Sequence, residues 1–327
     1  MDPSKIRKKI RRFRILIIGR ANAGKTTILR RVCNTRDNPI IYNSAGKKID
    51  LATITASRER GEHDIDNELV FESNPGFVFH DSRGFEAGSA TEFDKVKEFI
   101  TSRSKKTKLS DQLHAIWYCI PMDEAHRSFT EGENKFFSQC DTGTVPVIVL
   151  FTKFDAFYDV AFAELKKEGK SRKDAKELAP KHAEESFVNG PQLKFLKDVR
   201  WPPKCHVCLP NMNNDDADCG PLMERTAGTL GTNEVLEQLF VSTQQSNLEL
   251  CVKYAVDRTL KKYFDSKESE VHEVMIARVG VWFPHISVVS VSILVRARAM
   301  LIQVVARRSQ AIVARRSQES SPAVRSM

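Results

Sequence analysis

The chain has 327 residues, of which 41 % are hydrophobic and 28 % are charged, a composition that supports a sizeable folded core and excludes a wholly disordered protein. Residues 1–14 and 296–327 each carry a net charge of +6, which leaves −3 for residues 15–295 of a chain whose total is +9. The folded part is therefore slightly acidic, and we expect no nucleic acid as a partner.

The cysteines and the start of the chain indicate a compartment. Seven cysteines without a secretory signal suit a reducing environment. The apolar run Ile15 to Ile18 is too short for a signal peptide, which needs about 7–15 apolar residues. We expect a cytoplasmic protein, with attachment to the periphery of a membrane as a further option.

The folded part begins with a strand, a glycine turn and a helix. Phe13–Ile18 is a short β-branched apolar run typical of a buried strand. Gly19 ends this run, and apolar residues then recur at helical spacing over residues 28–32. Residues 34–67 are polar and give no assignment.

Strands and helices then alternate along the chain. Glu68–Phe71 and Phe77–His80 are predicted strands, joined by a turn at Asn74–Gly76. Alternating strands and helices indicate an α/β fold with a mostly parallel sheet between two helical layers. Ligands usually bind at the carboxyl ends of such strands. Further strands are expected at His114–Ile120, Pro146–Phe151 and Cys205–Leu209.

The helices are predicted from their start signals and from charge. Thr91 opens one helix, and Ser128 with Glu131 resembles the capped start of another. Residues near 159–190 are helix-prone and carry many charges of both signs, which predicts an inserted pair of surface helices. We expect Pro180 to interrupt this insertion.

The run Gly19 to Thr26 fits the pattern G-x-x-x-x-G-K-[ST] between a predicted strand and a predicted helix. Its glycines allow the backbone to curl until N–H groups converge on phosphate oxygens. Lys25 is placed to neutralise the β- and γ-phosphates, and the Thr26 hydroxyl to ligate Mg²⁺. The predicted nucleotide contacts in this stretch are Gly19, Asn22, Ala23, Gly24, Lys25, Thr26 and Thr27.

Two tetrapeptides, each directly after its own predicted strand, add a metal and a base to this phosphate site. Asp81-Ser82-Arg83-Gly84 resembles the D-x-x-G element of GTPases, in which Asp81 holds Mg²⁺ through water and Gly84 reaches the γ-phosphate. Thr152-Lys153-Phe154-Asp155 resembles the [N/T]-K-x-D element. By that resemblance Asp155 accepts hydrogen bonds from N1 and N2 of guanine, and adenine offers no such pair of donors. The resemblance also implies that Lys153 packs over the base and that Thr152, the first residue of the element, belongs to the nucleotide site.

In this order the three motifs resemble the P-loop GTPase superfamily, with Era-, septin- and Toc-type proteins as better-known relatives, over roughly residues 12–250. The stretches Arg60–Ile65 and His80–Gly88 look most similar to fungal "G domain-containing" proteins. The resemblance implies a sheet with one antiparallel edge strand, GTP or GDP with Mg²⁺ as ligand, and switch loops around the γ-phosphate.

The resemblance implies two further elements of the nucleotide site. A hydroxyl ligand of Mg²⁺ is expected within residues 53–57. Ser57 is the preferred candidate, and Thr55 and Thr53 are the alternatives. A loop that contacts the base is expected after the last strand, where Asn211 and Met212 occupy the place of the usual Ser-Ala-Lys.

The residue that would orient the attacking water is missing. Ras-like enzymes carry glutamine directly after the D-x-x-G glycine, and this chain has Phe85. Glu86 and His63 are the candidates within the chain, and a homodimer partner or an activating protein is the alternative source. We therefore predict slow hydrolysis by the isolated chain.

Two features outside these motifs have a simpler interpretation. Cys205 and Cys208, with Cys219 downstream, have the spacing of half a zinc site, but no second pair completes it, which favours buried or strand-edge cysteines. Residues 279–295 contain no formal charge and are short for a membrane span, which needs about 17–25 residues. Two interpretations of this stretch are equally favoured, an anchor in the membrane interface and a disordered tail. A membrane-spanning helix is less favoured than either.

These observations predict three regions and two functions. The regions are a basic N-terminal arm (1–11), a GTP-binding domain (12–255) and a hydrophobic, arginine-rich tail (256–327). The first function is a GTP-binding switch with slow GTPase activity. The alternative is a pseudo-GTPase scaffold, stabilised by nucleotide and tethered to a membrane surface by the tail.

Overall fold

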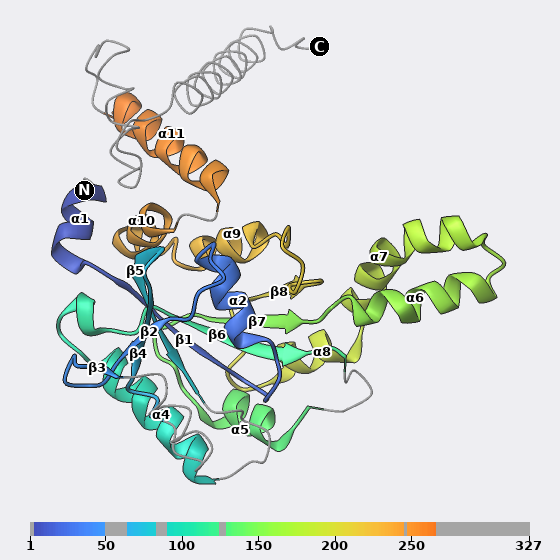
Figure 1. Ribbon diagram of the computed structural model, residues 1–327, viewed down its shortest axis with the longest axis horizontal. Coiled ribbons are helices and arrows are strands. Elements are labelled where there is room, and N and C mark those ends of the chain that lie inside the picture. Colours follow the sequence, from blue (N-terminus) through green and yellow to red (C-terminus); the bar gives the residue numbers. More distant parts are fainter. Residues whose placement is uncertain (1–2, 50–63, 83–89, 124–128, 245–246, 266–327) are drawn as a thin grey trace, which may run out of the picture. The chain divides into compact units, whose positions relative to one another are not determined.

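Figure 1 shows the computed structural model of the chain, which describes residues 3–49, 64–82, 90–123, 129–244 and 247–265. Lys5–Asn247 form one compact unit, and the helix α11 (Leu248–Asp265) belongs to a second. This helix continues across residues 255–256, where the sequence predicts the end of the GTP-binding domain, and that boundary stays a prediction. Residues 279–295 lie outside the described residues. None of the helices within those ranges combines the length and the apolarity that crossing a membrane requires.

An eight-stranded sheet forms the centre of the larger unit, in the order β3-β2-β4-β5-β1-β6-β7-β8. The five strands from β5 to β8 in this order are parallel, which confirms the predicted α/β fold with a mostly parallel sheet. The strands are β1 (Phe13–Gly19), β2 (Ile40–Tyr42), β3 (Lys48–Ile49), β4 (Glu68–Phe71), β5 (Asn74–Asp81), β6 (Ala115–Pro121), β7 (Val147–Thr152) and β8 (Cys205–Leu209).

The antiparallel part of the sheet is larger than predicted. Instead of one antiparallel edge strand, β4 pairs with β5, β2 with β4 and β3 with β2, all antiparallel. The two added strands lie in the stretch 34–67 that the sequence left unassigned. They span three and two residues, which is too short for a periodic pattern to be visible.

The predicted turn at Asn74–Gly76 is wrong. Asn74 already pairs with Phe71, so the turn between β4 and β5 is Glu72-Ser73. Gly76 lies within β5, where a Cβ atom would come 2.4 Å from Cγ2 of Thr243. The glycine therefore serves close packing of a helix on the sheet, and its turn propensity is overridden.

Helices cover both faces of the sheet (Figure 1). On one face Phe240 of α10 packs on Phe13 and Phe77, and Trp117 donates to Oγ1 of Thr226 in α9 at 3.2 Å. The other face carries an apolar cluster that includes Tyr118. The first face is covered by α2 (Lys25–Val32), α9 (Gly220–Thr229) and α10 (Glu234–Thr243), and the second by α4 (Ala90–Ser104), α5 (Glu131–Gln139) and α8 (Pro191–Asp198).

The remaining helices correct one prediction and add one element. The predicted charged insertion is a hairpin of α6 (Ala156–Lys167) and α7 (Arg172–Val188), which extends away from the sheet in Figure 1. Pro180 does not interrupt α7, because a stripe of alanines packs this helix against α6 and outweighs one lost hydrogen bond. The stretch predicted as a basic arm contains α1 (Pro3–Ile10), whose two isoleucines are buried.

The cap of α5 is also different from the predicted one. Thr130 is its N-cap, and Glu133 completes a capping box by accepting from the Thr130 backbone N–H at 2.8 Å. Ser128 lies outside the described residues. The pattern [ST]-x-x-E occurs twice in close succession here, and the pattern alone does not say which copy opens the helix.

His114 predicts how stability depends on pH. Its Nδ1 accepts from the backbone N–H of Arg14 at 2.9 Å, and its Nε2 donates to the Leu109 carbonyl at 2.7 Å. Burial, with a smaller effect from the Arg14 charge, lowers the pKa of His114 to about 4 against the raising effect of the Leu109 bond. Below about pH 6.5 the unfolded chain therefore takes up a proton that the folded chain does not, and this site removes up to about 1.4 kcal/mol of stability per pH unit.

We expect the free energy of unfolding, measured with urea, to be full at pH 7.5 and to fall between pH 6.5 and pH 4. In His114→Asn the amide oxygen still accepts from Arg14, but the side chain does not titrate, so the pH slope should be shallower. His80, whose pKa burial lowers to about 3, acts in the same direction and remains in the variant. An identical slope in both proteins would contradict the assignment.

Candidate functional site

The predicted site residues lie at one edge of the sheet, where the five parallel strands end. In the register, Asp81 of β5 is level with Ile17 of β1, and Gly19 of β1 is level with Cys119 of β6. Thr152, the last residue of β7, is level with Leu209, the last residue of β8. The carboxyl ends of parallel strands meet at one edge, so the three motifs and the loop after β8 converge there.

The P-loop is curled by residues with left-handed backbone angles. Gly19 has φ 141°, Asn22 φ 56° and Gly24 φ 75°. A Cβ atom on Gly19 would lie 2.1 Å from the Cys119 carbonyl oxygen, so only glycine fits at the end of β1. Nζ of Lys25 lies inside the curl, 3.1 Å from the carbonyl oxygen of Arg20. The Arg20 carbonyl thus holds the amine of Lys25 within the loop.

The charges of the P-loop and of Asp81 are close together. The pKa of the Cys119 thiol is raised to about 12, chiefly by burial; the Lys25 charge lowers it and the Asp81 charge raises it. Both charges therefore act on the same thiol. Thr26 is exposed at the N-terminal end of α2, and its hydroxyl is accessible to a ligand. Ala23 is buried and Thr27 is half-buried.

The predicted base-recognition element is held by contacts to the segment after β6 and to β8. Lys153 has φ 51°, and its Nζ lies 2.6 Å from Oδ2 of Asp123. The Phe154 ring is buried, and its backbone N–H donates to the Leu209 carbonyl at 3.3 Å. Left-handed backbone at a residue other than glycine persists only where the surroundings impose it, and such residues cluster at functional sites.

The predicted base residues Asp155 and Asn211 are in direct contact. Asn211 has φ 52°, and its backbone N–H donates to Oδ1 of Asp155 at 2.7 Å. This bond fixes one carboxylate oxygen and leaves the other available. The side chain of Met212, next to Asn211, is buried, and its carbonyl accepts from Nε of Arg31 at 3.1 Å.

The side chains at this edge fit a nucleotide with Mg²⁺. A lysine held by a curled glycine loop matches a polyphosphate, an exposed threonine hydroxyl and a nearby carboxylate match a hard divalent ion, and a fixed half-buried carboxylate matches a pair of N–H donors. The hydroxyl of Thr152 is buried without a hydrogen-bond partner among the described residues, next to this element. The donor set at the sheet edge therefore has the chemistry that a magnesium–nucleotide complex requires.

Comparison with known proteins gives a family that part of the chain resembles. The family model described as "50S ribosome-binding GTPase" matches residues 14–153, a range that contains the P-loop, Asp81 and the start of the base-recognition element. Residues 14–153 are therefore similar to this family of GTPases. No curated protein matches the chain.

Two solved structures of GTPase domains are also similar to the chain. The septin GTPase domain from Chlamydomonas reinhardtii is 16 % identical, with 46 % of this chain and 58 % of that chain covered and a TM-score of 0.28. A GDP-bound mutant of the FeoB G-domain from S. thermophilus is 13 % identical, with 94 % and 98 % covered and a TM-score of 0.31. These TM-scores are too low to support the assignment, which depends on the family model and the motifs.

The P-loop is anchored by an ion pair that the sequence did not predict. Nε of Arg20 donates to Oε1 of Glu133 at 2.8 Å, and Nη2 donates to Oε2 at 2.9 Å. The side chains of Arg20 and Glu133 are 4 % and 0 % exposed. Because Glu133 also caps α5, this pair joins the phosphate loop to the start of that helix. The T-x-x-E pattern at Thr130 was the available signal.

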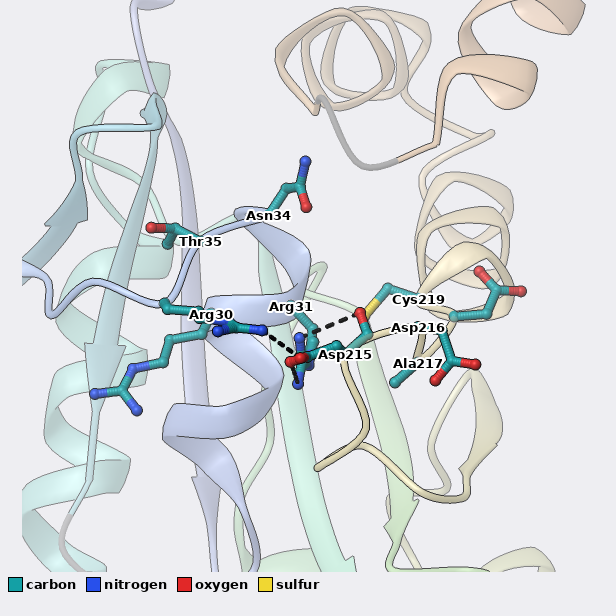
Figure 2. Close-up of a pocket in the computed structure, with 10 residues that line it drawn as sticks. Arg30, Arg31, Asn34, Thr35, Asp215, Asp216, Ala217 and Cys219 are labelled. Atoms are coloured by element: carbon teal, nitrogen blue, oxygen red, sulfur yellow. Dashed lines mark hydrogen bonds and ion pairs between the residues drawn. The ribbon is translucent and has the colours of Figure 1, made fainter.

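A second unpredicted contact holds the loop after β8. Nη2 of Arg31, in α2, donates to the Asn213 carbonyl at 3.0 Å and to Oδ1 of Asp215 at 3.2 Å. Arg31 and Asp215 line an open pocket of about 610 Å³ (Figure 2). Arg36 also pairs with Asp215, so the charges in this pocket compensate one another. The contact links the helix that begins at the P-loop to the loop that carries Asn211.

The zinc alternative has no support in the described residues, where no three potential ligands gather as a metal site would need. Cys205 and Cys208 both lie in β8, and side chains three residues apart in a strand point to opposite faces of the sheet. All seven cysteines lie within the described ranges, and all are free.

Several predicted residues of the GTPase domain lie outside the described residues. Ser57 and the threonines at 53 and 55 do so, as do the catalytic candidates. The same holds for the glycine of the D-x-x-G element and the phenylalanine after it. The predictions for this group, which comprises Ser57, His63, Gly84, Phe85 and Glu86, therefore stay predictions.

Proposed function

We propose that the protein is a guanine-nucleotide switch that binds Mg²⁺ with GTP or GDP and hydrolyses GTP slowly by itself. The observation that carries this proposal is the contact between Asp155 and the Asn211 backbone, at the same sheet edge as the curled P-loop. A carboxylate held in this way accepts the paired N–H donors of guanine and discriminates against adenine, which lacks them.

Each part of the ligand has a proposed set of residues. Lys25 neutralises the β- and γ-phosphates, with P-loop backbone N–H groups around them. Thr26, Asp81 and Ser57 hold Mg²⁺, which when bound offsets charge on the phosphates. Gly84 contacts the γ-phosphate. The base is held by Thr152, Lys153, Asp155, Asn211 and Met212.

The slow rate follows from the residue after the D-x-x-G glycine. Phe85 cannot orient water as glutamine does, so the catalytic group must come from Glu86, from His63 or from a partner. If the group comes from a partner, that partner is a second copy of the chain or an activating protein. If none of these acts, the chain is the pseudo-GTPase scaffold, for which Phe85 is the favouring observation.

Two measurements test this proposal. Displacement of a fluorescent GDP analogue should require far less GTP than ATP, and equal displacement would remove the guanine assignment. Single-turnover hydrolysis of GTP should be slow and should rise with protein concentration if a homodimer supplies the missing group. Absence of phosphate release at every concentration, with and without Mg²⁺, would leave only the scaffold.

Asp155→Asn should change the base preference. The new amide oxygen still accepts from the Asn211 N–H, which leaves the amide NH₂ facing the base, where it complements a carbonyl of xanthine and repels the N–H donors of guanine. We expect GTP affinity to fall by roughly a hundredfold and xanthine nucleotides to be accepted. Competition titrations measure both. Asp159→Asn, an exposed position in the same helix, is the control, and retained guanine preference in Asp155→Asn would place base recognition elsewhere.

A further inference from the structure

The imidazole of His80 is fully buried, and its hydrogen bonds to Arg14 and Ile65 define its tautomer. Its Nε2 lies 2.7 Å from Nη1 of Arg14, which also donates to Oε1 of Glu68 at 2.7 Å. A guanidinium group has no acceptor, so Nε2 accepts and the ring proton lies on Nδ1. Nδ1 lies 2.9 Å from the carbonyl oxygen of Ile65 and therefore donates to it.

These bonds join the turn that leads into β4 to the end of β5, beside the proposed Mg²⁺ ligand Asp81. Ile65 lies in the turn 64–67 that leads into β4, downstream of residues 53–57, where the hydroxyl ligand is expected. His80 is directly followed by Asp81, the proposed carboxylate ligand, at the end of β5. Neighbouring side chains in a strand point to opposite faces, so His80 itself cannot reach the ligand that Asp81 reaches.

Arg14 holds the imidazole in place from the opposite side. Its guanidinium is buried, and the bond from Nη1 to Glu68 anchors it to the first residue of β4. The ring of Phe99, from α4, packs against the imidazole at 4.8 Å between centroids. The ring of His80 therefore has one position, and the Ile65 carbonyl is tied to β5 through it.

We propose that His80 is a positioning residue, whose Nδ1–H bond to the Ile65 carbonyl sets the segment before β4 relative to Asp81 and thereby tunes the binding of Mg²⁺ with GTP. The inference rests on the proposed function and adds a residue that touches neither metal nor nucleotide. The hydroxyl ligand expected within residues 53–57 would contact Mg²⁺ only beside a γ-phosphate, so we expect GTP binding to be affected more than GDP binding.

Two substitutions separate the two hydrogen bonds of His80. In His80→Asn the amide NH₂ occupies the place of Nδ1 and still donates to Ile65, but the acceptor for Arg14 is lost. In His80→Gln the amide oxygen occupies the place of Nε2 and still accepts from Arg14, but the donor to Ile65 is lost. Both variants remove the same ring from its contact with Phe99, so the pair differs chiefly in which bond remains.

The readout is the Mg²⁺ concentration that gives half-maximal binding of a fluorescent, non-hydrolysable GTP analogue. We expect His80→Gln to raise this concentration about tenfold and His80→Asn to change it much less, with little effect of either on GDP. His114→Gln is the control, because His114 is equally buried and bonded to the Arg14 backbone but faces Leu109, and it should lower stability without moving the Mg²⁺ dependence.

Equal Mg²⁺ dependence in the two His80 variants, or an equal shift in the His114 control, would overturn this inference while leaving the proposed function intact. No binding of guanine nucleotide by the unsubstituted chain would overturn both. A measurement that needs no variant is the ¹⁵N signature of His80 in the intact protein. The Nδ1–H tautomer supports the inference, and the Nε2–H tautomer would contradict it.

Discussion

Arg20→Ala should lower the free energy of unfolding by about 3–5 kcal/mol, the usual cost of removing one partner from a buried ion pair. Glu133 would stay fully buried, with its carboxylate facing the space left by a guanidinium that makes two hydrogen bonds to it. The Thr130 N–H would still donate to Glu133, but one neutral donor does not compensate a buried charge. Urea denaturation without nucleotide measures the effect, since a bound ligand would mask it.

The double variant Arg20→Ala with Glu133→Gln tests this reason. The introduced glutamine amide would keep an acceptor for the Thr130 N–H and carry no charge, so the double variant should be more stable than Arg20→Ala alone. Lys181→Ala breaks an exposed pair with Glu185 and should cost no more than about 0.5 kcal/mol. A loss for Arg20→Ala as small as that for Lys181→Ala would mean that the pair does not anchor the P-loop.

Gly19→Ala should cost more than about 3 kcal/mol and abolish nucleotide binding. The new Cβ would lie 2.1 Å from the Cys119 carbonyl oxygen, and φ 141° is strained for any residue with a side chain. Because that oxygen belongs to the backbone of a central strand, relief requires β1 and β6 to separate where the P-loop begins. Thermal and urea unfolding give the stability, and fluorescent GDP gives the binding.

Gly46→Ala is the matched control for Gly19→Ala. Gly46 also has a positive φ, 75°, but a Cβ atom there meets nothing within 4 Å. Gly46→Ala should lower the free energy of unfolding by only about 1–2 kcal/mol, the cost of placing alanine in a left-handed backbone conformation. It should leave nucleotide binding unchanged. Equal losses in the two variants would show that backbone angle alone, rather than the approach of β6, requires glycine at residue 19.

The site residues in the described ranges illustrate how far local sequence reaches. Lys25 and Thr26 are recognisable because a phosphate loop demands glycine, lysine and hydroxyl at fixed spacing, and spacing is a property of sequence. Asp81 and Asp155 are recognisable because each belongs to a tetrapeptide that directly follows a buried apolar strand. The role of Glu133 was not recognisable from the sequence, because its partner Arg20 is far away in the chain and only the fold brings the two together.

The errors in secondary structure have the same origin. The composition of Asn74–Gly76 is typical of a turn, but these residues belong to β5, which pairs with β4, and Thr243 packs closely against Gly76. Pro180 reads as a break, but the alanines of α6 and α7 hold the helix together. The short strands β2 and β3 carry no readable period and exist through their pairing with one another and with β4. In each case contacts between distant segments outweigh a local preference.

The sequence by itself determined the class of fold, the phosphate loop and the guanine-type motif, because strand-turn-helix order and motif spacing are local and survive any detail of packing. Only the tertiary structure decided what holds these pieces in place: the Arg20–Glu133 pair, the Asn211 bond to Asp155 and the histidine between Arg14 and Ile65. Their partners are distant in sequence, so burial and hydrogen-bond geometry exist only once the sheet has formed.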